Sequence, residues 1–193
     1  MVSRGQKQAE LKGCSLSIMF QDESRFGRIN DIKRCWAVSK IRPEVAKQII
    51  REYMYIYGAF DPMNGTADML ILPSMTLEAM NIFLEELSIR HKDKFILLIC
   101  DGASNHRTES LKLPDNIMIE YLPPTSPQLN PSENVWDEMK EKFFHNRIFN
   151  SLENLVDRMV EAILHYEKNS EIVKSITGWH WIVNPICSIL NSN

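Results

Sequence analysis

The sequence predicts a single α/β domain in which a mixed sheet is covered by helices. Strand patterns concentrate in the earlier part of the chain, and the continuous apolar run at 95–100 is typical of a strand buried on both faces. Apolar residues at helical spacing become frequent later, at 77–87 and again beyond 151. The length of 193 residues suits one domain, and 44% apolar with 24% charged residues is an ordinary globular composition.

The first predicted strand covers Leu16 to Asp22, because Leu16, Ile18, Phe20 and Asp22 occur at every second position and therefore share one face. The segment 61–65, Asp-Pro-Met-Asn-Gly, has the composition of a turn. The other predicted strands are part of 28–39 around Cys35–Val38, and then 53–60, 67–72, 95–100 and 117–122.

Each predicted helix begins at a residue that caps helices well. At the second helix, Pro131 would take the first helical position, where its missing N–H costs nothing. The three predicted helices are 76–89 with Thr76 as the cap, 130–143 with Asn130, and a last long helix from Ser151 through about Leu164.

Several protein classes are excluded by composition. No apolar run approaches the roughly 18 residues of a membrane helix, and the first residues lack the apolar stretch of a secretion signal. The four cysteines, at 14, 35, 100 and 187, form no C-x-x-C pair, which argues against a zinc site and against disulfides. We therefore expect a cytoplasmic protein with no membrane partner.

Charge is unevenly distributed along the chain. Residues 1–58 contain 11 Lys/Arg and 6 Asp/Glu, whereas the remainder contains 11 and 19. A basic N-terminal part could place phosphate contacts on one face of the protein. Solvated surface charge without any ligand explains the same distribution equally well, and the total net charge of −3 by itself mildly opposes binding to nucleic acid.

Three acidic residues occupy positions where a carboxylate is costly. Asp22 ends an apolar strand face, and Asp101 directly follows six apolar residues. Neither has an obvious basic partner nearby in sequence, so a divalent cation would remove the cost. Simpler structural roles exist for each of them: both Asp could form turns or caps, and Glu133 could complete a capping box with Asn130. Spacing alone does not separate these alternatives.

The order Asp22, Asp101, Glu133 occurs within three longer motifs, namely Gln21-Asp22-Glu23, CDGASNH from Cys100, and YLPPTSPQLNPSENVW from Tyr121. Together these resemble the catalytic domain of IS630-type DDE transposases, in the IS630/Tc1/mariner superfamily, over about 15–163. The turn from Gly58 to Gly65 and the Phe-Leu-Glu-Glu-Leu helix at 83–87 fit the same family. The chain departs from the pattern in one respect: 31 residues separate Asp101 from Glu133, about three fewer than usual, although a trimmed loop need not move either acid.

The resemblance implies an α/β, RNase H-like fold with a mixed five-stranded sheet flanked by helices. It implies that Asp22, Asp101 and Glu133 are catalytic and bind two Mg²⁺ or Mn²⁺ ions, with Asp22 touching both. Such ions, about 3.5–4 Å apart, activate a water or a 3′-hydroxyl and stabilise the leaving oxygen in phosphodiester displacement. The implied activity is DNA strand cleavage at transposon ends followed by strand transfer into target DNA.

Other residues are weaker candidates around this site. Glu23, Asn105, His106 and Asn134 could support the metal ligands, although a lone His is more often simply hydrogen-bonded, and Glu23 should point to the opposite strand face from Asp22. Candidate DNA contacts are Arg25, Arg28, Arg34 and Arg42. Trp136 is expected in the core, while Trp179 and Trp181 would indicate a DNA or partner surface if exposed and a lid if buried.

The resemblance also indicates the organisation of the protein. We expect a polar lead-in at 1–14, a catalytic domain at 15–193, and a helix-turn-helix DNA-binding domain supplied by a separate segment, since such a domain normally precedes the catalytic part in this family. A homodimer or larger synaptic assembly in a prokaryotic, nucleoid-associated setting is expected. Two other functions stay open: an RNase H-like nuclease without strand transfer, and a non-catalytic DNA-binding or assembly remnant of a transposon.

Overall fold

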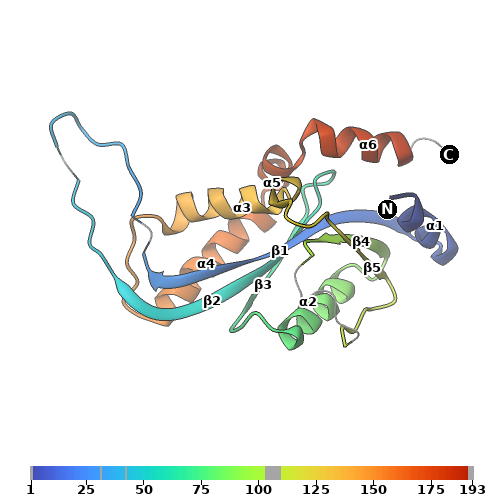
Figure 1. Cartoon of the computed structure of the whole chain (residues 1–193), viewed down its shortest axis with the longest axis horizontal. Helices are drawn as coiled ribbons and strands as arrows, with labels where there is room; N and C mark the ends of the chain where they lie inside the picture. The colour runs from blue at the N-terminus through green and yellow to red at the C-terminus, as the bar shows by residue number, and fades with distance from the viewer. Residues whose placement is uncertain (1, 31, 42, 103–109, 191–193) are drawn as a thin grey trace.

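A mixed five-stranded sheet forms the centre of the computed structural model, which describes residues 2–30, 32–41, 43–102 and 110–190. The strand order is β3-β2-β1-β4-β5, with antiparallel pairing from β3 to β1 and parallel pairing from β1 to β5. The strands are β1 (Ser15–Ile29), β2 (Ile49–Phe60), β3 (Ala67–Leu72), β4 (Lys94–Cys100) and β5 (Ile117–Tyr121). The predicted mixed sheet flanked by helices is therefore confirmed (Figure 1).

The helices cover both faces of this sheet. They are α1 (Val2–Lys12), α2 (Leu77–Arg90), η2 (Pro127–Leu129), α3 (Ser132–Met139), η3 (Lys140–Phe144), α4 (Leu152–Glu167), α5 (Ser170–Thr177) and α6 (His180–Leu190). Thr76 and Ser151 cap α2 and α4 as predicted, each accepting a hydrogen bond from the backbone N–H three residues on. No helix in the described part of the chain is long and apolar enough to cross a membrane.

Successive side chains of β1 point to opposite faces of the sheet, and this decides which apolar cluster each of them joins. Met19 packs with α2 on one face of the sheet. On the other face, Ile18 and Phe20 pack with α6, whereas Phe26 packs with α3 and α4. Because Asp22 has the same parity as Phe20 and Phe26, it lies on the second face, between these two apolar clusters. The predicted shared face of the first strand is confirmed by this arrangement.

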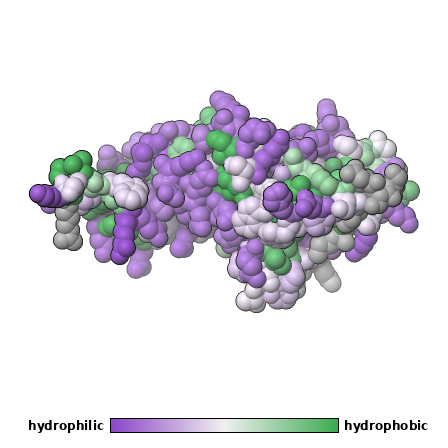
Figure 2. All heavy atoms as spheres, turned by 90° about the horizontal axis from the view of Figure 1, so that it is seen from above, coloured by the Kyte–Doolittle hydropathy of each residue, from purple (hydrophilic) through white to green (hydrophobic). Residues whose placement is uncertain are grey.

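The strand predicted around Cys35–Val38 is wrong. β1 instead continues to Ile29 and pairs there directly with Ile49 of β2, so residues 30–48 only connect the two strands. An apolar run becomes a strand only where a partner edge is free, and here both neighbours pair with each other. The connection, called the arm below, projects from the body (Figure 1), and its exposed apolar atoms are visible at one end of the molecule (Figure 2). Trp36, in the arm, is fully exposed.

Both ends of the chain contain helices that the sequence patterns did not predict. The expected polar lead-in contains α1, which packs on the sheet because Gly5 and Ala9 are small enough to lie buried against it. At the other end, α5 and α6 follow α4, and α6 places Ile182 and Ile186 over β1 and β4. The two ends of the domain lie near each other (Figure 1), since α1 and α6 are in contact.

Candidate functional site

Asp22 lies on β1 where the second sheet face passes from one apolar cluster to the other. Its cross-strand partner is Gly58 of β2, and a Cβ at that position would come within 2.7 Å of the Trp136 ring. The glycine therefore leaves the space that the Trp136 ring of α3 occupies against β2. From there the indole N–H of Trp136 donates a hydrogen bond to Asp22 Oδ2 at 3.0 Å.

The pairing of β4 with β1 brings Asp101 to the same region of the sheet as Asp22. The two strands are parallel and pair residue by residue up to Phe20 and Ile99, where the ladder ends. Asp22 lies within β1, two residues after the last pair, and Asp101 directly follows the last residue of β4. Asp101 is therefore at the carboxyl end of the strand that neighbours β1.

Glu133 comes from the first turn of α3, which side chains tie to β1. Asn130 donates its amide N–H to the carbonyl of Gln21 at 3.1 Å, and Ser132 donates its hydroxyl to the carbonyl of Phe20 at 3.1 Å. The Asn130 side chain also accepts from the backbone N–H of Ser132. Because α3 begins at Ser132 with Pro131 at the cap position, the helix starts one residue later than predicted, and Asn130 lies two residues before it. These bonds hold the start of α3 next to Asp22.

Glu133 does not form the predicted alternative, a capping box with Asn130. That motif needs the glutamate side chain to accept from the backbone N–H of Asn130, but this N–H donates to the carbonyl of Pro127. Among the residues that the structure describes, the Glu133 carboxylate accepts no hydrogen bond and forms no ion pair. Its exposed side chain is left to face the cavity described next.

All three acids line one cavity of about 260 Å³. The strand ends supply Asp22, Asp101 and Gly102, and α3 supplies Glu133. The opposite wall is the proline-rich segment after β5, within the YLPPTSPQLNPSENVW motif. The wall and floor residues are Leu122, Pro123, Pro124, Thr125, Ser126, Pro127 and Asn130. Prolines fix the backbone and remove donors, so this wall is stiff and the acids provide most of the charge.

Burial and the negative charge of Glu133 both raise the pKa of Asp22. Desolvation, and then the nearby Glu133 carboxylate, raise the pKa of Asp22 to about 7 despite its hydrogen bonds from the Glu23 backbone and from Trp136. Within the described residues, neither Asp22 nor Glu133 has an ion pair with a basic side chain. In the described structure, no basic side chain balances the negative charge of these two acids. The third acid, Asp101, lines the same cavity.

Comparison with known proteins identifies the family. A family model described as DDE superfamily endonuclease matches residues 17–156, which include all three acids. The chain belongs to this endonuclease family. A 111-residue stretch is 43% identical to the uncharacterized protein y4pE/y4sA of Sinorhizobium fredii (strain NBRC 101917 / NGR234), covering 57% of this chain and 82% of that protein.

Solved structures confirm the RNase H-like fold of this DDE endonuclease domain. A pre-cleavage Mos1 transpososome superposes with a TM-score of 0.60 at 13% identity, covering 97% of this chain and 60% of the other. The Mos1 mariner paired end complex with Mn gives a TM-score of 0.57 at 16% identity, covering 97% and 62%. The chain thus spans about three fifths of the length of these Mos1 chains.

The family acids do not form a ready-made metal cluster. Within the described parts of the chain, no three His, Cys, Asp or Glu side chains are grouped closely enough to hold an ion. The three acids share the cavity without converging on one point in it. Cys100, beneath them, is fully buried, and desolvation together with the nearby acids raises the pKa of its thiol, so it is an inert core residue as predicted.

The predicted supporting residues differ in where the structure places them. Burial, and after it the nearby Glu23, raise the pKa of Tyr57, which packs in the α2 core; this agrees with the predicted position of Glu23 on the strand face opposite to Asp22. Asn134 donates to the carbonyl of Pro131 and does not line the cavity. Asn105 and His106 lie outside the described residues.

Of the predicted DNA contacts, Arg28 has a structural role. Its guanidinium donates to the carbonyls of Phe149 and Asn150 and pairs with Glu52 at 2.6 Å, and only 11% of its side chain is exposed. Arg25 and Arg34 are exposed. Arg42 lies outside the described part of the chain. Sequence reasoning missed the hydrogen bond from Trp136, which lies in the core as expected, because period and hydropathy carry no sign of what an indole N–H contacts.

Proposed function

We propose that this domain is the catalytic part of an IS630-type transposase, which cleaves DNA at transposon ends and transfers the freed strand into target DNA. One observation carries the proposal: Asp22 and Glu133 lie close enough to raise the Asp22 pKa, without basic partners among the described residues, in a cavity that also includes Asp101. A largely buried carboxylate with a second carboxylate beside it, such as Asp22, is costly for the fold alone. Membership of the DDE endonuclease family supports the same assignment.

The donor set fits Mg²⁺ or Mn²⁺. Asp22, Asp101 and Glu133 offer only carboxylate oxygens, which hard divalent cations prefer, and no described His or Cys lines the cavity. Two bound ions would supply activation of the attacking oxygen and stabilisation of the leaving oxygen. Holding them would require the three carboxylates to approach one another more closely than they do in the protein alone.

The remaining groups of the site orient these ligands. Trp136 fixes one oxygen of Asp22 by hydrogen bonding, and the Asn130 and Ser132 bonds to β1 fix the start of α3 and with it Glu133. The proline-rich wall from Pro123 to Pro127 limits the approach of substrate to the side of the cavity that the carboxylates face. Each of these features restricts motion at the site, which lowers the cost of reaching a reactive geometry.

The partners follow from the reaction. DNA would be bound as transposon end and as target, and joining two ends calls for a homodimer or a larger synaptic assembly. End recognition would come from a separate DNA-binding segment. The fold likeness to Mos1 complexes, whose names describe a transpososome and paired transposon ends, supports this proposal, and the similar Mos1 structures with Mn and with Mg support the choice of metal.

The test is nicking and joining of DNA in Mn²⁺. The domain, alone or with the upstream segment of its transposon, should nick plasmid DNA, and Glu133→Gln should abolish nicking. Asp137→Asn, one turn further along α3 and also exposed, is the matched control and should stay active. Joining of a pre-cut transposon end separates a transposase from a plain nuclease, and absence of nicking in every preparation would overturn the proposal.

A further inference from the structure

The α2 helix forms a groove on the side that faces away from the sheet. The groove has a volume of about 750 Å³, and its walls are α2 from Glu78 to Ile89 and the segment 112–114. It is called the α2 groove below. Three exposed apolar side chains line it, namely Ile82, Ile89 and Leu113. Exposed apolar side chains that gather in one place are typical of a surface that binds a partner.

The charge of the α2 groove is acidic. Glu78 and Glu85 line it, against one basic residue, Lys112. Both glutamates are exposed, and neither forms an ion pair with a described basic side chain. Such a surface repels DNA, which carries a negative charge at every phosphate. The α2 groove therefore favours an occupant that is both apolar and positively charged.

The arm has both of these properties. It contains five Lys/Arg and two Asp/Glu. Its exposed apolar side chains include Trp36, Val38 and Ile41, and two exposed cations, Arg34 and Lys40, occur in the same stretch. Neither of these cations forms an ion pair with a described acid. A fully exposed tryptophan gains by burial in a contact, and tryptophan is enriched among the residues that dominate protein interfaces.

The base of the arm is fixed to the body. Asn30 donates its backbone N–H to the carbonyl of Gln48 and its amide N–H to the carbonyl of Ala46, and the Gln48 backbone N–H donates to the Asn30 amide oxygen at 2.8 Å. Further out, the backbone N–H of Ile41 donates to the carbonyl of Val38 in a turn. The arm lies well apart from α2 (Figure 1), so it does not reach the α2 groove of its own chain.

We propose that the arm of one copy of this chain occupies the α2 groove of a second copy, with Trp36 against the apolar lining and Arg34 and Lys40 facing the two glutamates. The inference deepens the proposed function, on which it rests only for the expectation of a synaptic assembly. Neither surface includes the three acids, because α2 packs on the sheet face opposite to Asp22. Under two-fold symmetry each copy gives one arm and receives one, so the contact closes as a dimer.

The test is an exchange of charge between the two surfaces, measured by sedimentation velocity of the whole chain without DNA or metal. One variant carries Arg34→Glu and Lys40→Glu in the arm, and the other carries Glu78→Lys and Glu85→Lys in the α2 groove. Wild type should be a dimer. Each variant alone sets like charges against each other and should be a monomer. In an equal mixture every arm meets a groove of opposite charge, so the mixture should recover the dimer.

The apolar part of the contact is tested separately by Trp36→Ser. We expect this change to raise the dimer dissociation constant by about tenfold or more, as for a central aromatic residue of an interface. Val160→Ser removes an exposed apolar side chain of α4, outside both surfaces, and should leave the dimer unchanged. All the replaced side chains are exposed, and thermal unfolding of each variant confirms that it is folded.

Three results overturn the inference: a monomeric wild type, charge variants that dimerise like wild type, or a mixture that stays monomeric. Weaker DNA binding by the arm variant, with wild-type behaviour of the groove variant, would assign the arm to DNA instead. The nicking assay separates this failure from failure of the proposed function. Glu133-dependent nicking without arm–groove association removes only the present inference, whereas a dimer recovered in the mixture without any nicking removes only the catalytic proposal.

Discussion

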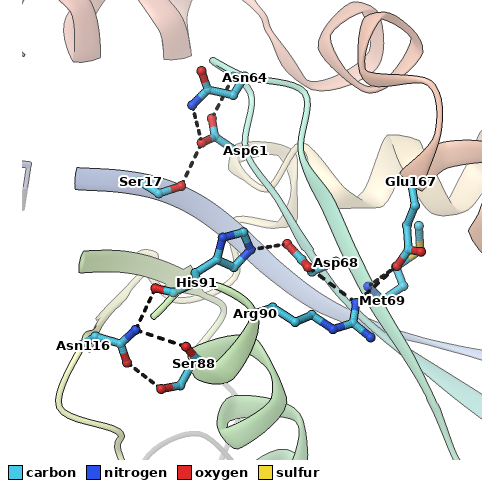
Figure 3. Close-up of polar contacts among 10 residues, drawn as sticks. All are labelled: Ser17, Asp61, Asn64, Asp68, Met69, Ser88, Arg90, His91, Asn116 and Glu167. Atoms are coloured by element: carbon cyan, nitrogen blue, oxygen red, sulfur yellow. Dashed lines mark hydrogen bonds and ion pairs between the residues drawn. The ribbon is translucent and has the colours of Figure 1, made fainter. Parts of the chain in front are cut away.

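The fold surrounds two pairs of acids with very different neighbours: Asp61 and Asp68, and Asp22 and Glu133. Asp61 and Asp68 are buried, and their oxygens are engaged by neighbouring groups (Figure 3). Asp61 accepts from the backbone N–H groups of Met63 and Asn64, and also from the side chains of Ser17 and Asn64. Asp22 and Glu133, in contrast, form no ion pair with any described basic side chain, and burial and then the Glu133 carboxylate raise the pKa of Asp22.

The Asp68 neighbourhood joins three elements of the fold. Asp68 of β3 contacts His91 Nε2 at 2.7 Å and Arg90 at 3.5 Å, both at the end of α2. Arg90 also pairs with Glu167 at the end of α4, and Glu167 accepts from the backbone of β3 (Figure 3). The charges here compensate one another, so the network serves to hold α2 and α4 on the edge of the sheet.

The comparison separates structural acids from functional ones by a physical criterion. A carboxylate that the fold needs is surrounded by donors or cations, because an unpaired buried charge is costly. A carboxylate that awaits a ligand keeps that cost in the free protein, and the ligand removes it on binding. By this criterion Asp61 and Asp68 are structural acids, whereas Asp22, with Glu133 beside it, fits the proposed role of a ligand-binding acid.

The largest effect is expected for Asp22→Asn, which keeps the size of the side chain and removes its charge. If the carboxylate exists for a metal, nicking should fall by more than about a hundredfold, since even residues that merely orient metal ligands cost 10–100-fold. The metal-free variant should nevertheless melt at a higher temperature than wild type, because the amide removes the charge that burial and Glu133 disfavour. Activity assays and thermal unfolding in a chelator measure the two effects.

The same variant has a second expected signature in added metal. Mn²⁺ should raise the melting temperature of the wild-type protein by binding the native state, and should raise that of Asp22→Asn much less. A variant that is both inactive and less stable than wild type in chelator would place Asp22 with Asp61 and Asp68, as a structural acid, and would remove the basis of the comparison.

The pH dependence of stability is the next largest effect. Because folding raises the pKa of Asp22 from 3.8 to about 7, the native state binds this proton more tightly than the unfolded state. The stabilisation is complete below about pH 4 and is lost as the pH rises toward about 7, a total of about 4 kcal/mol.

Urea unfolding of metal-free protein from about pH 5 to about pH 8 tests this loss. Over that range the stability of wild type should fall relative to Asp22→Asn by about 3 kcal/mol. The difference between the two proteins isolates Asp22, because their other titrating groups are the same. A pH-independent difference would show that Asp22 stays charged in the native state.

A smaller effect is expected at the structural acids. Asp61→Ala would leave the Ser17 hydroxyl, the Asn64 amide and two backbone N–H groups without their acceptor. We expect a loss of at least about 2 kcal/mol in the free energy of unfolding, with no gain at any pH and no change in the metal concentration needed for nicking. A stabilised Asp61→Ala protein would contradict the assignment of this acid to the fold.

Sequence patterns predicted most of the strands and helices, because these patterns depend only on residues that are close together in the chain. The alternation from Leu16 to Asp22 and the apolar run at 95–100 each matched a strand, and Thr76 and Ser151 matched helix caps. The error at Cys35–Val38 and the omission of α1 have another cause. Whether an apolar run pairs, or a polar segment finds small residues to pack with, depends on neighbours that are distant in sequence.

The acids of the site were also found from the sequence, but not their surroundings. The positions of Asp22 and Asp101 after apolar runs, together with the motif around Glu133, pointed to one cavity, and all three line it. No pattern indicated that the Trp136 N–H would reach Asp22, because strand and helix meet there only through the packing of α3 on β1. Contacts between elements that are distant in the chain cannot be predicted from such local patterns.

The smallest expected effect concerns Trp136, which joins the core to Asp22, the proposed metal ligand. Trp136→Phe keeps a ring in the core but removes the N–H that donates to Asp22, so nicking should fall about tenfold and require more metal. The loss should also raise the pKa of Asp22 further, since this hydrogen bond lowers it, and the rising limb of the pH–rate profile should move to higher pH. Phe60→Leu, which disturbs the ring packed edge-on against Trp136 at 5.3 Å without touching the hydrogen bond, is the matched control. If both variants shift the metal requirement and the pH profile equally, packing rather than the indole N–H sets the behaviour of Asp22.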